Sequence, residues 1–300
     1  MGIITQLYRY LATTPDRYSC FGKRATDVEF VQFGERFPEA QCLDSLIQSL
    51  FQRLCANRSA TSLQDFGEFH FISQTPQGIC LGKVIPSADK SGREYPLAVI
   101  VKSQQQHYQQ QIFLLPYRYH ELYDLSLNSE PGSLPQRIEA TLANVPDKAT
   151  VLSTCLSDLR SLSVGDYLTA CPFQASETGF IAVLSGNIKK ILANDPLCLP
   201  LPNDQTVTAS VAFWLYCFSH SMTGDTVQVI WRRPPNASAA WLYLWQSPVT
   251  AERFSELLVE QYALSQLVCT DTVTTIDEAR HRSLFSLLED QSSFSHQSYF

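Results

Sequence analysis

The chain has 300 residues, of which 45% are hydrophobic and 17% are charged, and its formal net charge at pH 7 is −7. This length commonly makes one large domain or two ordinary ones, and the composition supports a buried core and argues against disorder along most of the chain. The negative charge and the lack of any Lys/Arg run longer than a pair oppose attraction to phosphate backbones. We therefore expect no nucleic-acid partner.

The first clear element is a helix that begins at Pro38, a residue type preorganised for a first helical turn. Apolar side chains then recur at the spacing of one helix face, at Leu43, Leu46, Ile47, Leu50, Phe51 and Leu54. Polar residues occupy the opposite side. The pattern predicts a helix that lies on a sheet with its apolar stripe inward.

Strands are predicted next over 69–72, 78–85 and 95–101. The third contains Leu97–Val101, an apolar run without polar alternation, which indicates a central strand covered on both faces. A fourth strand is predicted over Ile112–Leu115, after an exposed turn over 104–111. The first half of the chain is therefore predicted to form an antiparallel sheet with helices packed against it.

The second half follows a polar, proline-containing stretch at 128–135, which indicates a domain boundary or a long surface loop. Its predicted elements are helices over 138–145, 152–165, 180–192 and 208–220, a hairpin over 227–231 and 241–245, and a helix from Thr250. Trp241, Tyr243 and Trp245 share one face of a strand, so all three are buried or all three are offered to a partner. The tail over 291–300 shows no packing pattern.

The sequence gives little support for a membrane-spanning segment, a metal site or a disulfide framework. The longest wholly apolar run, 211–218, is far shorter than the ~20 residues that span a bilayer, and the N-terminus lacks an export signal. The nine cysteines are odd in number and widely spread, with no Cys-x-x-Cys and no nearby His pair. We expect reduced thiols packed in the core of a cytoplasmic protein, with no metal and no cofactor.

The segment Pro86–Leu97 lies between two predicted strands and suits a tight connection. Asp89 and Gly92 fit the first and fourth positions of a type I turn. The Asp89 carboxylate can bond local backbone N–H groups, and Arg93 can pair with Asp89 or with a glutamate at 29 or 94. Chemistry alone favours a well-specified hairpin with no further role.

This segment also resembles the Pro-Ser-x-Asp-x-x-Gly-Arg-x-x-Pro signature of the TagF/ImpM family, which is associated with type VI secretion. A second match lies upstream, where Phe21-Gly22-Lys23 leads to Glu29-Phe30-Val31 ahead of the first helix, as Gly-Lys-Leu-Pro leads to Gly-Asp-Phe-Val in the family. Arg24-Ala25 and Val28-Glu29 depart from that motif. A weaker third match combines the Trp241–Trp245 strand, Pro248 and the Phe254–Leu258 segment.

The resemblance implies a non-enzymatic, post-translational repressor of the contractile secretion apparatus that binds its forkhead-associated scaffold protein. It also implies an α/β (α+β) sandwich similar to longin or SNARE-like domains. The expected organisation is a TagF-like N-terminal domain over 1–130, a second α/β half packed on it over 131–275, and a C-terminal helix with a loose tail over 276–300.

Partner contacts are expected at five exposed positions, provided that the 21–31 loop folds next to the turn: Lys23, Glu29, Asp89, Lys90 and Arg93. Six further residues are expected to build the motif itself: Gly22, Phe30, Pro86, Ser87, Gly92 and Pro96. No membrane insertion and no small-molecule substrate are expected.

Two other functions stay open. The chain could be a structural or assembly component of the secretion apparatus, which the sequence does not distinguish from a repressor. An unrecognised hydrolase or thiol enzyme is less favoured, because Ser219-His220-Ser221 lacks a nucleophile motif and His281 lacks a second metal ligand. No glycine-rich phosphate loop occurs either, so we expect no catalytic residue.

Overall fold

The computed structural model describes residues 16–56, 67–103, 111–128, 133–170, 197–202, 206–219, 226–233 and 240–245, with the single positions 250 and 252. In this part of the chain, one antiparallel sheet has the strand order β2-β1-β5-β4-β3-β7-β8-β6. The strands are β1 (Arg17–Gly22), β2 (Val31–Gly34), β3 (Glu68–Thr75), β4 (Gly78–Ile85), β5 (Leu97–Ser103), β6 (Leu197–Leu201), β7 (Val227–Arg233) and β8 (Ala240–Trp245).

Strands from both halves of the sequence belong to this one sheet. β3 pairs with β4 on one side and with β7 on the other, so that His70 lies opposite both Lys83 and Trp231. β7 and β8 form the predicted hairpin pair, and β6 extends it at the edge. The predicted fold class, an antiparallel sheet flanked by helices, is confirmed. The division of the chain at residue 130 and the likeness to longin domains stay predictions.

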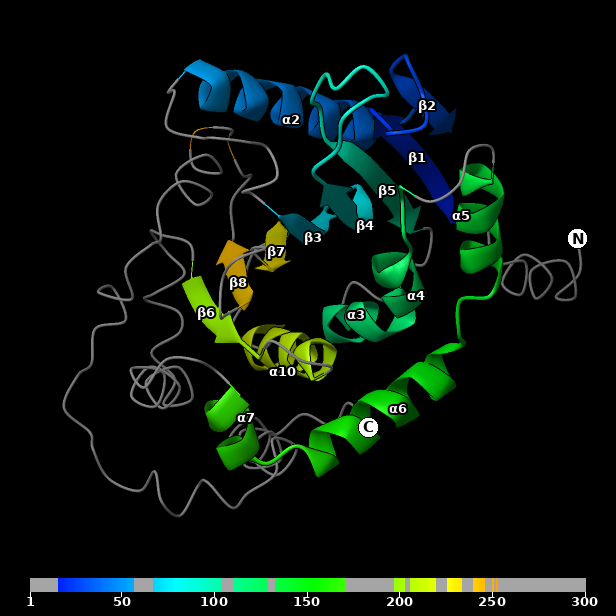
Figure 1. Cartoon of the computed structure of the whole chain (residues 1–300). Helices are drawn as coiled ribbons and strands as arrows, with labels where there is room; N and C mark the ends of the chain where they lie inside the picture. The colour runs from blue at the N-terminus through cyan, green and yellow to red at the C-terminus, as the bar shows by residue number, and fades with distance from the viewer. Residues whose placement is uncertain are drawn as a thin grey trace, which may run out of the picture.

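One face of the sheet is covered by α2 (Pro38–Ala56), which runs along the top of Figure 1. Its predicted apolar stripe packs inward, with Ile47 and Leu50 buried against the sheet. The aromatic residues of β8 belong to the same cluster: Tyr243 and Trp245 are buried and Trp241 packs against them. The shared face of these three side chains is therefore a core face.

The other face carries the remaining described helices (Figure 1). They are η3 (Ile112–Leu114), α3 (Leu115–Arg118), α4 (His120–Asp124), α5 (Leu134–Ala143), α6 (Lys148–Ser161), α7 (Val164–Ala170) and α10 (Val207–Ser219). The sequence of α10 has no charged residue, and it contacts η3, α3, α6 and β6. Inside this layer, the Trp214 indole N–H donates to the Tyr167 hydroxyl at 3.0 Å. The prediction of a buried helix over 208–220 is confirmed.

Most element predictions in the described residues hold, and β5 is buried on both faces as expected of a central strand. The strand predicted at Ile112–Leu115 is wrong, because this run forms the 3₁₀ turn η3 and the start of α3. Four apolar residues fit a buried strand or a buried helical turn equally well, and Pro116 favours the helical start. The helix predicted to reach Gly165 ends at Ser161, and α7 begins anew at Val164.

Several predictions fall outside the described residues. They are the turn over 104–110, the loop over 129–132, the helix over 180–192, the helix that follows Thr250 and the tail over 291–300. His220 and His281 also lie outside the described residues.

Candidate partner-binding site

The two motif segments lie against each other at one end of the sheet. We call them the β1–β2 loop (residues 23–30) and the β4–β5 turn (residues 86–96). The backbone N–H of Lys90 donates to the Asp27 carbonyl at 2.8 Å, and an Arg93 guanidinium N–H donates to the Val28 carbonyl at 2.6 Å. The adjacency on which the expected partner contacts depended is therefore observed.

Gly22 brings the end of β1 into close contact with the end of the turn. Its φ is +132°, and a Cβ atom at this position would lie 2.1 Å from the Pro96 carbonyl oxygen and 2.7 Å from the Leu97 Cα atom. Only glycine fits here, because it tolerates a positive φ and has no Cβ atom to overlap with the Pro96 carbonyl oxygen. Two motif positions, Gly22 and Pro96, therefore serve one packing contact.

Asp89 organises the turn from inside. Its Oδ1 atom accepts the backbone N–H groups of Ser91 and Arg93, both at 2.9 Å. Its Oδ2 atom lies 2.7 Å from the Arg93 Nε atom and 3.1 Å from the Lys23 ammonium. A β-turn is present at the predicted position, since the Gly92 N–H donates to the Asp89 carbonyl at 2.9 Å.

These contacts set the charge state of Asp89. Desolvation of the carboxylate raises its pKa, but hydrogen bonds from the Arg93 backbone, Lys23, the Arg93 side chain and the Ser91 backbone outweigh it and hold the pKa at about 2. The carboxylate is therefore ionised at neutral pH, and it joins the β1–β2 loop to the turn.

The five expected partner contacts divide into two groups. The prediction of Asp89 as an exposed partner contact is wrong, because its side chain is 0% exposed and accepts hydrogen bonds from the backbone of the turn. The Lys23 side chain is 17% exposed and pairs with that buried carboxylate. Glu29 and Lys90 are exposed, and Arg93 is exposed although its guanidinium is held by Asp89 and Val28. Polar side chains in a turn can bond the turn itself, so sequence alone did not separate the two groups.

Sequence reasoning missed Val28 as a surface residue and placed Phe30 among the residues that build the motif, not among the partner contacts. Val28 is 51% exposed and Phe30 is 45% exposed, and both stand in the β1–β2 loop. Phe30 packs edge-on to Tyr95 with ring centroids 5.5 Å apart, and the Tyr95 hydroxyl donates to Asp44 of α2 at 2.9 Å. The aromatic type of Phe30 within a loop could have indicated a surface role, since aromatic residues are enriched at the energetic centres of interfaces.

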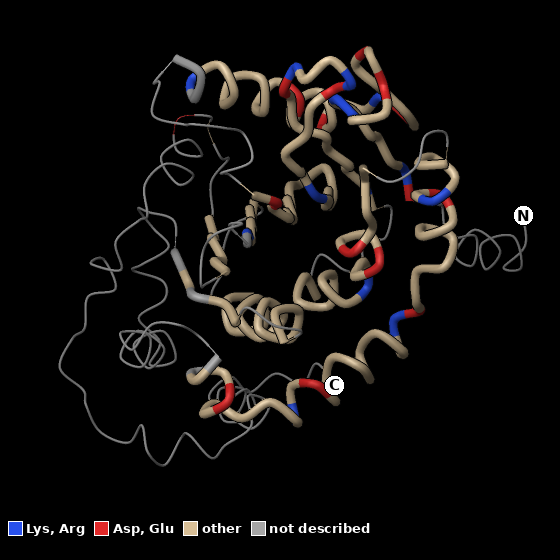
Figure 2. The backbone as a smooth tube through the Cα atoms, in the orientation of Figure 1, with Lys and Arg blue, Asp and Glu red and all other residues tan. Residues whose placement is uncertain are grey.

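We define the motif surface as the exposed side chains of Val28, Glu29, Phe30, Lys90 and Arg93. Opposite charges flank its two apolar side chains, and Arg93 lies 4.0 Å from Glu29 across it. Figure 2 shows that charged residues of both signs gather on the loops beside β2 and the start of α2, whereas α10 is free of them. This mixture of an apolar centre and a charged rim is typical of a protein–protein contact.

Residues 19–145 match the family model described as the TagF N-terminal domain, Type VI secretion system-associated. The chain carries a TagF N-terminal domain. The resemblance seen in the sequence is confirmed over this segment, and it associates the chain with type VI secretion. The TagF N-terminal domain includes both motif segments and every described element from β1 to α5, apart from the first residues of β1.

No curated protein matches the chain. Among solved structures, it is similar to the crystal structure of PA0076 from Pseudomonas aeruginosa PAO1, with 15% sequence identity and a TM-score of 0.43. That likeness covers 80% of this chain and 93% of the other. Beyond the TagF N-terminal domain, β6, β7, β8 and α10 complete the sheet and its helical layer.

Neither a cluster of metal-ligating side chains nor a membrane-spanning helix occurs among the described residues. No group of three or more His, Cys, Asp or Glu side chains in this part of the chain could hold a metal ion. Nor do the helices assigned in it include one with the length and hydropathy to cross a membrane.

Proposed function

We propose that this chain is a non-enzymatic, post-translational repressor of a type VI secretion system, and that it acts in the cytoplasm by binding a forkhead-associated scaffold protein through the motif surface. The association with type VI secretion rests on the match of residues 19–145 to the TagF N-terminal domain. The observation that carries the choice of surface is the exposure of Val28 and Phe30 on a loop fixed by the motif residues.

The internal order of the site supports a binding role. The Asp89 carboxylate holds both segments by four contacts, and Gly22 closes the base of the turn against Pro96. A surface that is already ordered loses little conformational freedom when a partner docks, which favours affinity. Phe30 and Arg93 are residue types that often dominate the energy of such interfaces.

A binding measurement with matched variants tests the surface. We would titrate the purified forkhead-associated scaffold protein of the same secretion system into the wild type, Phe30→Ser and Lys90→Glu by calorimetry. Phe30→Ser is expected to weaken binding about tenfold or more, because interface aromatics often contribute about 2 kcal/mol. Lys148→Glu, an exposed charge reversal at the start of α6, is the control and should bind like the wild type.

Secretion activity tests the repressor role separately. Overproduction of the wild type and of Lys148→Glu should lower secretion of a type VI effector, whereas overproduction of Phe30→Ser should not. Full secretion in all three strains would reject repression. Co-sedimentation of the wild type with contractile sheaths, together with loss of secretion on deletion of the chain, would instead identify an assembly component.

A further inference from the structure

A cavity of about 680 Å³ lies on the α10 face of the sheet, away from α2. Its floor is the end of the sheet where β3 begins and β4 and β7 end. Its walls come from α4, from the segment 125–128 and from the first residues of α10. A volume of this size falls within the range of roughly 300–1,000 Å³ that is usual for small-molecule sites.

The floor carries a row of polar and aromatic side chains in register across three strands. Lys83, His70 and Trp231 lie directly opposite one another on β4, β3 and β7. The Lys83 ammonium donates to the Glu68 Oε1 atom at 2.9 Å and to the Tyr123 carbonyl at 2.6 Å. Its side chain is 4% exposed, so this positive charge is already neutralised within the protein and is closed to a ligand.

Glu68 presents one carboxylate oxygen to the cavity. Burial raises its pKa, but the His70 hydrogen bond and the Lys83 ammonium outweigh this and lower it to about 2, so the carboxylate is ionised. Oε1 lies 2.9 Å from Lys83 and 2.6 Å from His70 Nε2, while Oε2 has no hydrogen-bond partner among the described residues. The Glu68 side chain is 39% exposed, and Oε2 is therefore the atom available to a ligand.

A second carboxylate lines the same cavity from α4. Asp124 is exposed, and its side chain makes no hydrogen bond or ion pair with a described residue. Burial lowers the pKa of His70, which keeps this imidazole neutral at pH 7. Because Lys83 offsets the charge of Glu68 and His70 is neutral, it is Asp124 that leaves the charge facing the cavity negative.

Arg232 also borders the cavity, but it does not change this balance. It pairs in register with Phe69 and Trp241, and both of these residues pack on the α2 side of the sheet. Residues directly opposite one another on paired strands point to the same face, so the Arg232 side chain lies on the far side from the cavity.

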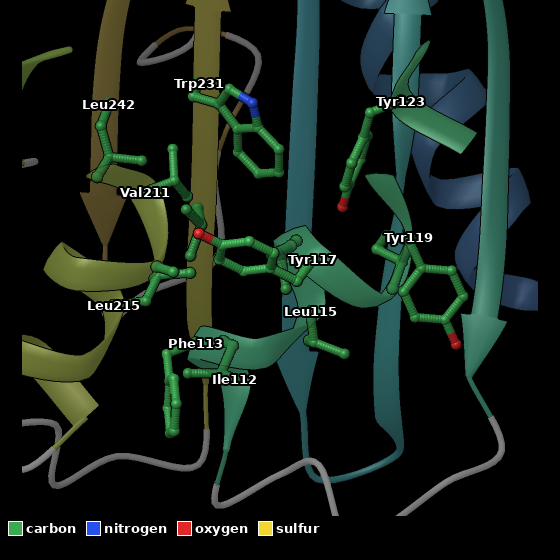
Figure 3. Close-up of a cluster of buried hydrophobic side chains, with 14 of the residues drawn as sticks. Ile112, Phe113, Leu115, Tyr117, Tyr119, Tyr123, Val211, Leu215, Trp231 and Leu242 are labelled. Carbon is green, nitrogen blue, oxygen red and sulfur yellow. The ribbon is translucent and has the colours of Figure 1, made fainter. Parts of the chain in front are cut away.

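Two aromatic side chains complete the site. Tyr123 and Trp231 both line the cavity and meet edge to face with ring centroids 4.9 Å apart, as Figure 3 shows over one face of the sheet. His70 stacks on one face of Tyr123, with centroids 5.0 Å apart, which leaves the opposite face of that ring for a ligand. Aromatic faces attract organic cations, most strongly in a partly desolvated site. We propose that this cavity binds a small organic cation that carries protonated amines, of the polyamine class, with Glu68 and Asp124 as its carboxylate contacts. This site is independent of the motif surface and of the proposed repressor role.

Calorimetry with spermidine at physiological salt tests the proposal on the full chain. We expect saturable binding of one spermidine per chain. Asp124→Asn should weaken it about threefold, as for a partly exposed charge pair. Glu68→Gln should weaken it about tenfold, because it removes a charge-assisted hydrogen bond. Glu121→Gln is the matched control, since Glu121 is an exposed residue of α4 that does not line the cavity.

Asp124→Asn keeps the test valid if Glu68→Gln disturbs the fold, because Asp124 has no hydrogen bond or ion pair to lose within the described residues. No heat of binding with spermidine would overturn the proposal. So would affinities that fall equally in Asp124→Asn and Glu121→Gln, which would indicate diffuse attraction to an acidic protein. Binding of the dianion succinate in place of spermidine would reverse the assigned charge of the ligand and overturn it as well.

Discussion

Substitution of Gly22 by alanine should destabilise the protein through two separable effects. The first is backbone strain, since φ at this position is +132° and a non-glycine residue there costs about 1–3 kcal/mol. The second is overlap of the new Cβ atom with the Pro96 carbonyl oxygen, which would lie 2.1 Å away. Relief of such overlap by movement of the backbone costs about 1–3 kcal/mol more.

Gly78→Ala separates the two effects. Gly78 has φ +129°, but a Cβ atom there would meet nothing within 4 Å, so this variant carries the strain without the overlap. In thermal unfolding followed by tryptophan fluorescence, Gly22→Ala should melt roughly 3–8 °C below Gly78→Ala. Equal melting temperatures would show that the backbone at Gly22 and Pro96 can move apart without loss of stability. The packing role assigned to Gly22 would then be refuted.

Three further outcomes are expected. Because the pKa of Asp89 is held below its ordinary value of 3.8, at about 2, its contribution to stability is present above pH 4 and is lost as the pH falls from about 4 to 2; acid unfolding of Asp89→Asn should lack this component. Lys83→Met should lower the free energy of unfolding in urea by about 1–3 kcal/mol, because Glu68 and the Tyr123 carbonyl lose a buried donor; an unchanged midpoint would contradict this. Native alkylation followed by peptide mapping should modify Cys42, which is exposed, and spare four buried thiols whose pKa is raised by burial, Cys20, Cys80, Cys155 and Cys217. Labelling of all five in the folded protein would contradict their assigned burial.

The sequence predicted elements best where one period dominated a long segment. The stripe of α2 and the apolar length of α10 each allowed one structure, and both helices are present within a residue or two of the predicted limits. Short segments were less informative. β1 and β2 carry four to six residues each and were not predicted, although the motif loop between them was noticed. The run at Ile112 satisfied two patterns, and only its place under α10 decides between them.

The candidate site was predictable in its composition but not in the direction of its side chains. The turn chemistry of Asp89 and Gly92 followed from residue type, and the observed hydrogen bonds agree with it. The burial of Asp89 did not follow, because it depends on Lys23 and Val28, which lie some sixty residues away in sequence. The cavity on the α10 face gave no sequence signal, since its walls come together only when β3, β4 and β7 pair.

The double pairing of β3 limits how this protein can be dissected. A fragment that stops at residue 145 would lose β7, and with it the partner of Glu68–Gln74 along one whole edge. It would also lose α10, which covers the apolar face of the same strands. An open strand edge beside an uncovered apolar face is prone to self-association. Residues 19–145 thus delimit a unit of family likeness, whereas the sheet that contains β3 continues to Trp245.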